Sequence, residues 1–358
     1  MSFVDSGVSH SPFSATFEID GVTIGRGEQT YIIAEIGSNH NQDLDQAKAH
    51  INEAAAAGAD AVKFQTFRFD DLYHQETTEQ ETKEFYENVS LPFDWHAELQ
   101  EYAHGQDVTF LSTPTHPEAL ELLEDIDVPA YKIGSPQVAV DPDLIADVAT
   151  CGKPMLVSSG LGGYGSVEDA LDSCLEAGLH DIAVLHCISE YPTDPSAAQL
   201  RRIARLQRAL GTIVGYSDHT ESTTIPAGAV CLGADIVEKH FTLDRTLDGP
   251  DHHFALEPAE FAEMAEGIRE IDSGLGNGLK FGPTESEQES RESVKLKLVA
   301  ADRLPTDTAV TRDCVRLRRS PDGIPRSVLD DLVADGVRTS TDIGAGELIR
   351  WQDLTDQS

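Results

Sequence analysis

The chain of 358 residues has little positive charge. It holds nine lysines and 17 arginines against 63 aspartates and glutamates, which gives a formal net charge of −37 at pH 7. We therefore expect no nucleic acid partner, because binding a phosphate backbone requires a basic surface. The acidic residues are spread among apolar segments, which disfavours disorder. Such dispersed charge is typical of halophilic proteins, and self-repulsion should destabilise the fold in low salt.

Other features are also missing. No apolar run approaches the roughly 18 residues that suggest a membrane span, and the chain does not open with basic residues followed by an apolar run. We therefore expect neither a membrane span nor a signal peptide. The five cysteines form no Cys-x-x-Cys pair, which indicates reduced thiols in a cytoplasmic protein.

Three of the nine lysines lie inside short apolar runs. Lys63 lies in AVKFQ, Lys132 in PAYKIGS and Lys239 in IVEKH. Burying an ammonium group is expensive, so such a site needs a compensating anion. A phosphate or carboxylate ligand would serve, and so would a buried carboxylate partner. Three unrelated structural ion pairs are the alternative interpretation.

Short β-rich runs alternate with helical patterns along most of the chain. Eight strand–helix units over about 250 residues predict a (β/α)8 TIM barrel. A doubly wound open sheet is disfavoured, because no Gly-x-Gly-x-x-Gly turn follows the first strand. The predicted strands are 31–35, 61–64, 109–112, 130–133, 155–158, 182–186, 212–216 and 235–238, with helices at 44–57, 117–123, 143–150, 167–177 and 197–209.

The composition of the sequence changes after about residue 282. We expect a TIM-barrel catalytic domain at 1–282, a polar linker with helix potential at 283–304, and a small β-rich domain at 305–358, where short segments are punctuated by Pro and Gly.

Every predicted strand ends in polar residues, although core packing does not require them there. Active sites of TIM barrels lie at these carboxyl ends of the strands. Ammonium groups and hydroxyl donors that surround one anion are suited to binding a phosphate. The residues of this kind are Lys63, Lys132, Ser135, Ser158 and Ser217.

Two histidines follow neighbouring predicted strands. His219 and His240 end the seventh and eighth strands, which lie about 4.8 Å apart in a sheet, so both imidazoles can share one metal ion. Glu35 on the first strand closes against the eighth and could complete the site. Such ligands suit Mn²⁺, Mg²⁺, Co²⁺ or Zn²⁺. Of the other histidines, His252 and His253 are rival ligands, and His186 is interpreted as structural.

Several long motifs, in order, resemble the sialic acid synthases (N-acetylneuraminate synthases). They are IAEIGSNHN at 33–41, GADAVKFQT at 58–66, STP at 112–114, YKIGS at 131–135, YSDHT at 216–220 and EKHFT at 238–242. The likeness covers the whole predicted barrel. The segment RRSPDGI at 318–324 is similar to part of the family's C-terminal SAF (antifreeze-like) domain.

The resemblance implies a metal-dependent transferase that condenses phosphoenolpyruvate with an N-acyl amino-hexose, giving a nine-carbon 2-keto acid and phosphate. It implies a divalent cofactor, Mn²⁺ first and Mg²⁺ or Co²⁺ as alternatives, held by His219 and His240. It also implies a domain-swapped homodimer in which Arg319 reaches the partner subunit's site. Phosphoenolpyruvate would contact Lys63, Lys132, Ser135, Ser158 and Ser217, and the sugar would contact Glu35, Gln65, Ser189, Tyr191 and Asp251.

The chain departs from the family pattern in places that bear on sugar choice. Pro136-Gln137 stands where many members have Gly-Glu, and Ser189 stands where some have Asn. Residues 68–91, which by the resemblance should help to bind the sugar, do not align by eye. N-acetylmannosamine and the 2,4-diacetamido-6-deoxy precursors of legionaminic or pseudaminic acid are therefore competing substrates.

Two other classes of function are alternatives. One is a metal-free aldolase that forms a Schiff base on Lys132 or Lys63. The other is a non-catalytic barrel that binds sugar as a sensor.

Overall fold

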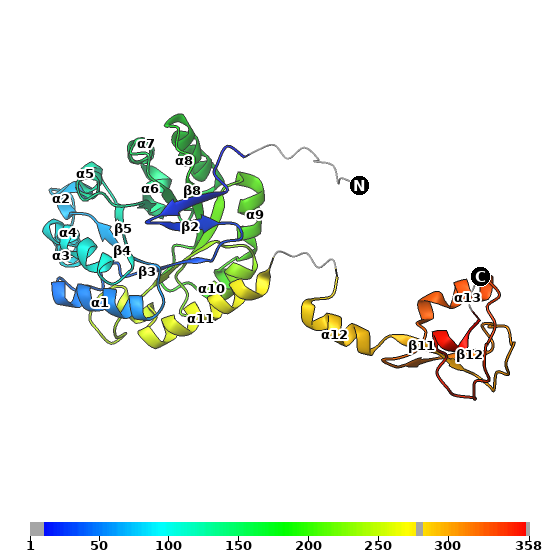
Figure 1. The fold of residues 1–358 in the computed structure, drawn as a ribbon. Helices are drawn as coiled ribbons and strands as arrows, with labels where there is room; N and C mark the ends of the chain where they lie inside the picture. Colours follow the sequence, from blue (N-terminus) through cyan, green and yellow to red (C-terminus); the bar gives the residue numbers. More distant parts are fainter. Residues whose placement is uncertain (1–10, 277–281, 356–358) are drawn as a thin grey trace. The chain divides into compact units, whose positions relative to one another are not determined.

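The computed structural model describes residues 11–276 and 282–355, which belong to two compact units, 1–277 and 278–358. The first unit is a closed barrel of parallel strands in the order β10-β3-β4-β5-β6-β7-β8-β9, surrounded by helices (Figure 1). This confirms the predicted TIM barrel. Its strands are β3 (Tyr31–Glu35), β4 (Ala61–Thr66), β5 (Thr109–Pro114), β6 (Tyr131–Ile133), β7 (Met155–Ser158), β8 (Ile182–Cys187), β9 (Ile213–Asp218) and β10 (Ile236–His240).

Most helices of this unit pack apolar side chains against the outside of the barrel, where they form its largest core. Asp43 begins α1 by accepting hydrogen bonds from the backbone N–H groups of Asp45 and Gln46, as an N-cap should. The helices are α1 (Leu44–Ala56), α2 (Phe69–Leu72), α3 (Gln80–Val89), α4 (His96–His104), α5 (Pro117–Asp125), α6 (Ser135–Val140), α7 (Pro142–Thr150), α8 (Tyr164–Glu176), α9 (Arg201–Leu210), α10 (Thr224–Cys231) and α11 (Pro258–Leu275).

A hairpin that the sequence did not lead us to expect precedes the barrel. Strands β1 (Thr16–Ile19) and β2 (Val22–Gly25) pair antiparallel. Phe17, Ile19 and Ile24 share a core with inward-facing residues near the amino-terminal ends of the barrel strands. The hairpin therefore packs at that end of the barrel, which leaves the carboxyl ends for a pocket.

The predicted helix at 197–209 begins later than expected. A 3-10 turn at Pro195–Ala197 comes first, capped by the Asp194 side chain. Gln199 then adopts a φ of 49°, in the left-handed region, so a continuous helix cannot run through it. Helix α9 begins at Arg201.

The second unit has its own small core, with Leu298, Ala300, Ile324 and Ile349 fully buried. Its elements are α12 (Glu285–Ser293), β11 (Leu296–Ala300), β12 (Val315–Arg319) and α13 (Leu329–Ala334). Strand β11 pairs antiparallel with β12. Residues 296–300, which we expected to lie in a linker, are therefore part of this sheet.

Candidate active site

The register of the barrel brings polar side chains from separate motifs to one level. His240 on β10 lies beside Glu35 on β3, and Glu35 lies beside Lys63 on β4. Register partners in adjacent strands point to the same side of a sheet, and residues alternate along each strand. Three motifs far apart in sequence therefore place their functional side chains together.

Two buried carboxylates compensate two of the buried lysines. Lys63 Nζ lies 2.6 Å from Glu35 Oε2 and 3.9 Å from Glu238 Oε2, and Lys132 Nζ lies 3.5 Å from Glu238 Oε1. All four residues are at most 4% exposed. Lys132 also donates to Ser158 Oγ at 2.8 Å, and Ser217 Oγ donates to Glu238 at 2.9 Å. The pocket therefore holds a preorganised network of charges and hydroxyl groups.

The third buried lysine lies elsewhere. Lys239 lies between Glu238 and His240 on β10, so it faces outward from the barrel, where its Nζ is 2.7 Å from Asp218 Oδ2. This is a structural ion pair. Of the three lysines that the sequence analysis singled out, two belong to the pocket and one to the scaffold.

A pocket of about 600 Å³ opens at the carboxyl ends of the strands. Ser189 does not line it directly, but its hydroxyl lies 2.8 Å from that of Ser135, which does. Arg319 ends β12 in the second unit. All other predicted site residues line this pocket: Glu35, Lys63, Gln65, Lys132, Ser135, Ser158, Tyr191, Ser217, His219, His240 and Asp251.

His219 and His240 offer neutral imidazoles to the pocket. Their ring centroids are 5.3 Å apart. His219 Nδ1 lies 2.6 Å from the carbonyl oxygen of Ile188, which places the proton on Nδ1 and leaves Nε2 as an acceptor. His240 Nδ1 is buried without a hydrogen-bond partner. Burial lowers the pKa of both rings, and neutral imidazole is the metal-binding form.

Other histidines have partners that suit a structural role. His252 Nδ1 lies 2.6 Å from Thr242 Oγ1. His186 Nε2 lies 2.8 Å from the Ala198 carbonyl oxygen. Among the residues lining the pocket, His219 and His240 are the only histidines.

The two carboxylates in the lysine network differ in protonation. Burial raises the pKa of Glu35 to about 7, although Lys63 opposes this. Burial also acts on Glu238, but Lys132 and Lys63 overcome it and lower its pKa. Glu238 is therefore the permanent counter-ion, and Glu35 is the group poised to exchange a proton near neutral pH.

Glycines at two positions let polar groups approach each other closely. Gly37 has a φ of 53°, and a Cβ there would lie 3.0 Å from Asp251 Oδ2 and 3.3 Å from Glu35 Oε1. A Cβ on Gly160 would lie 2.2 Å from Ser189 Oγ and 2.8 Å from Ser135 Oγ. No side chain fits at either site without displacing residues of the pocket.

Sequence reasoning missed two parts of the pocket. Glu238 was not among the predicted site residues, although it lies two positions before His240 and so shares its side of the strand. The second part is a set of four aromatic side chains in residues 67–89. The segment 68–91 was expected to help bind the sugar, but no spacing pattern singled out these rings. These are Phe67, Tyr73, Phe85 and Tyr86.

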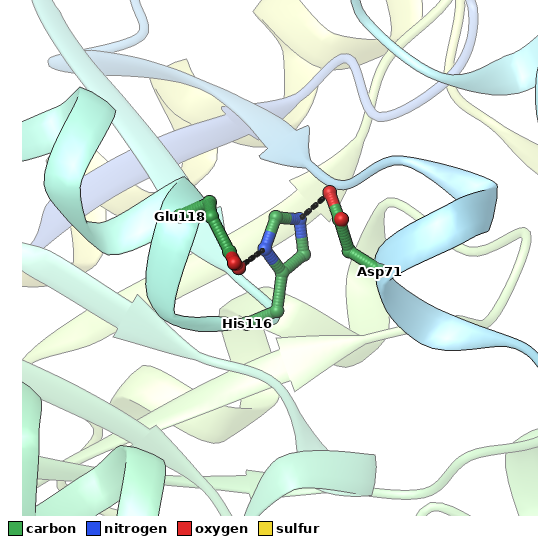
Figure 2. Close-up of side chains that lie close together, drawn as sticks. All are labelled: Asp71, His116 and Glu118. Carbon is green, nitrogen blue, oxygen red and sulfur yellow. Dashed lines mark hydrogen bonds and ion pairs between the residues drawn. The ribbon is translucent and has the colours of Figure 1, made fainter.

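A separate polar cluster joins α2 to α5 (Figure 2). His116 Nδ1 lies 3.1 Å from Glu118 Oε2, and Nε2 lies 3.4 Å from Asp71 Oδ2. One ligand atom from each of the three side chains lies within 4.8 Å of the others, but Glu118 is largely exposed and each carboxylate already faces its own ring nitrogen. Nδ1 also accepts from the Ala119 backbone N–H and caps α5. We interpret this cluster as a structural clamp.

No helix in the described part of the chain is long and apolar enough to cross a membrane. The five cysteines are free thiols, and of these Cys174 and Cys187 are buried.

Comparison with known proteins gives a consistent result. A model of the NeuB family matches residues 50–280. The N,N'-diacetyllegionaminic acid synthase of Campylobacter jejuni is 35% identical over 83% of this chain and 92% of its own. The human N-acetylneuraminate-9-phosphate synthase is 31% identical over 88% of this chain and 91% of its own. A crystal structure of N-acetylneuraminic acid synthetase from Leptospira borgpetersenii, in complex with citrate, superposes with a TM-score of 0.72 at 32% identity, covering 80% and 97% of the two chains. The chain therefore belongs to the NeuB family, the sialic acid synthase family that its motifs resemble.

Proposed function

We propose that the protein is a nonulosonic acid synthase that condenses phosphoenolpyruvate with an N-acyl amino-hexose and releases phosphate. The observation that carries the proposal is one pocket that combines two buried lysines, a set of hydroxyl groups and two neutral histidines. Lysines and hydroxyls suit the phosphate and carboxylate of phosphoenolpyruvate. The relatives' names supply the reaction class.

The charge of the pocket supports a divalent metal ion as cofactor. Three carboxylates and two ammonium groups line it, which leaves a formal charge of −1 when Glu35 is ionised and before any substrate enters. An anionic substrate would be repelled unless further positive charge were present. The unpartnered His240 Nδ1 and the free Nε2 of His219 fit a metal ion, with Asp251 Oδ2 4.0 Å from His240 Nδ1. A divalent ion bound there would act as a Lewis acid on the aldehyde oxygen of the open-chain sugar.

The protein's own residues then have distinct tasks. Lys63, Lys132 and Ser158 hold phosphoenolpyruvate so that its carbon 3 faces the aldehyde carbon, and a new C–C bond forms between them. Positive charge develops at carbon 2, and a water molecule adds there. Glu35 is the carboxylate placed to accept a proton from that water. The resulting tetrahedral centre breaks its bond to the phosphate oxygen, which gives the 2-keto acid and inorganic phosphate.

The test is phosphate release from phosphoenolpyruvate in high salt with Mn²⁺, with and without N-acetylmannosamine or a 2,4-diacetamido-trideoxyhexose. We expect release that requires a sugar and stops when a chelator is added. Lys132→Met should abolish it, whereas the control Lys48→Met, which removes a surface ion pair with Glu98, should not. Sugar-independent inactivation by borohydride and pyruvate would instead support the Schiff-base aldolase. Sugar binding without any turnover would support the sensor.

The domain-swapped homodimer belongs to this proposal. It rests on the family resemblance of the segment that contains Arg319, which is exposed at the end of β12. If Arg319 serves a partner's pocket, mixing inactive Arg319→Ala with inactive Glu35→Gln protein should restore part of the activity through mixed dimers. No recovery after subunit exchange would contradict the swap.

A further inference from the structure

One wall of the pocket has a chemistry that the phosphoenolpyruvate end does not share. Phe67, Tyr73, Phe85 and Tyr86, which we call the aromatic wall, line the pocket together with Leu72 and Val89. Tyr86 is its centre: the ring centroids of Tyr73, Phe85 and Phe67 lie 4.7, 5.3 and 5.8 Å away. Phe85 is 46% exposed, although burying it would be favourable. A surface of this kind suits a ligand with apolar faces.

Most of the aromatic wall belongs to a segment of the chain that is rich in acidic residues. Residues 68–91 contain seven aspartates and glutamates but only Arg68 and Lys83 as cations. Arg68 Nε is paired with Asp71 Oδ2 at 2.6 Å, and its guanidinium lies over the Phe93 ring at 4.4 Å. Lys83 Nζ lies 3.7 Å from Glu87 and 5.6 Å from the centre of the Phe69 ring. Neither cation lines the pocket, so both are committed elsewhere.

The cations that do line the pocket are also committed. They are Lys63 and Lys132, which lie against Glu35 and Glu238 and which the proposed function assigns to phosphoenolpyruvate, so neither is left for a second phosphate. A divalent ion would raise the formal charge of the lining from −1 to +1, but the phosphate and carboxylate of phosphoenolpyruvate together carry more negative charge than that, so the pocket is negative again once this substrate is bound. A phosphate group on the sugar would add more, next to an acidic segment and without a donor cation in the described lining. Burying an uncompensated charge of that kind is strongly unfavourable.

We propose that the aromatic wall selects an uncharged amino sugar with apolar substituents and excludes a sugar phosphate. The substituents that suit it are the methyl groups of N-acyl arms and of a 6-deoxy carbon. This inference rests on the function proposed above and narrows its second substrate. Each buried methyl or methylene group contributes about 10–200-fold in specificity, so two such groups can decide between related sugars.

The experiment measures phosphate release by the full-length protein with three sugars in parallel, in high salt with Mn²⁺. They are a 2,4-diacetamido-2,4,6-trideoxyhexose, N-acetylmannosamine and N-acetylmannosamine 6-phosphate. We expect kcat/KM to fall in that order, with the 6-phosphate at least about 100-fold below the trideoxy sugar. Equal or better use of the 6-phosphate would overturn the inference but leave the proposed function intact. No release with any sugar would overturn both.

Variants at the centre of the wall separate recognition from general damage. Tyr86→Ala should lower kcat/KM for the trideoxy sugar by about 10-fold or more, while the KM for phosphoenolpyruvate stays within about twofold. Tyr86→Lys should raise the relative use of the 6-phosphate, because it adds the missing cation. The matched control is Tyr102→Ala on α4, whose hydroxyl meets Asn52 and which does not line the pocket. If Tyr86→Ala lowers activity equally with all three sugars, the wall does not determine specificity.

Discussion

Acidification from pH 7 to pH 5 should destabilise the barrel unit, because it holds several histidines in a neutral, buried state. Burial lowers the pKa of His40, His50, His96 and His186 to about 4, against 6.5 when unperturbed. All four are fully buried. Below pH 6.5 these histidines bind protons in the unfolded chain, whereas in the folded chain they do so only at about pH 4. Their contribution to stability is therefore complete above pH 6.5 and is lost as pH falls through that window.

The magnitude follows from the size of the shifts. At pH 5 each histidine lowers the free energy of unfolding by about 2 kcal/mol, so the four together lower it by roughly 8 kcal/mol. Two carboxyl groups act in the opposite direction, because burial raises the pKa of Glu35 to about 7 and of Asp235 to about 6. As the pH falls, these two carboxyl groups become protonated in the folded chain before they do in the unfolded chain. This adds about 3 kcal/mol to the free energy of unfolding by pH 5. The net loss is about 5 kcal/mol, a large share of the 5–15 kcal/mol typical of a domain.

Urea unfolding at pH 7 and pH 5 would measure this loss. Both titrations are run in about 2 M NaCl, so that changes in surface charge are screened. Trp351→Phe removes the tryptophan of the second unit, so fluorescence reports on Trp95, whose ring lies 6.4 Å from that of His40. His50→Gln should reduce the pH dependence by about 2 kcal/mol. The exposed His104→Gln is the control.

The reasoning would be refuted if the free energy of unfolding were the same at both pH values. It would also fail if His50→Gln showed the same difference as the unmodified chain.

Three further predictions concern packing and charge. Gly160→Ala should raise the KM for phosphoenolpyruvate at least about tenfold, because the new Cβ meets Ser189 Oγ at 2.2 Å, whereas Gly163→Ala, with no atom within 4 Å, should not. Lys239→Met should destabilise the fold by about 3–5 kcal/mol by leaving Asp218 buried and unpaired, and replacing both residues with apolar ones should recover most of this; urea titration of the three proteins checks it. The melting temperature should rise by at least several degrees between low salt and about 2 M NaCl, because the chain carries a net charge of −37; a flat or falling curve would contradict the self-repulsion argument.

Strand positions were predictable because parallel barrel strands are buried on both faces. The runs at 31–35 and 155–158 were predicted with the bounds that the structure has. Strands β9 and β10 extend two residues further than expected, to Asp218 and His240. Their last residues are polar, so composition alone ends the strand too early, while neighbouring strands continue to supply hydrogen-bond partners.

The site was predictable where a motif placed a residue at a strand end, and less so where a partner came from another strand. His219 and His240 were expected at the ends of neighbouring strands, and the strand order of the closed barrel confirms that position. Glu238 was overlooked because its role in the site comes from its ion pairs with Lys63 and Lys132. Those residues lie on other strands and reach Glu238 only when the barrel closes. The hairpin β1–β2 was overlooked because its short strands become stable only against the core they cover.

The sequence by itself determined the alternation of strands and helices, the family, and the residues that gather at the strand ends, because apolar periodicity and motif order are local properties of the chain. Only the tertiary structure decided which buried lysine belongs to the pocket. Lys63 and Lys239 both lie in apolar runs, yet the first points into the barrel toward Glu35 and the second points outward toward Asp218. The segment 68–91 was expected to help bind the sugar, but only the structure decided that its aromatic rings form one wall, because they come together only when α2 and α3 pack beside the strand ends.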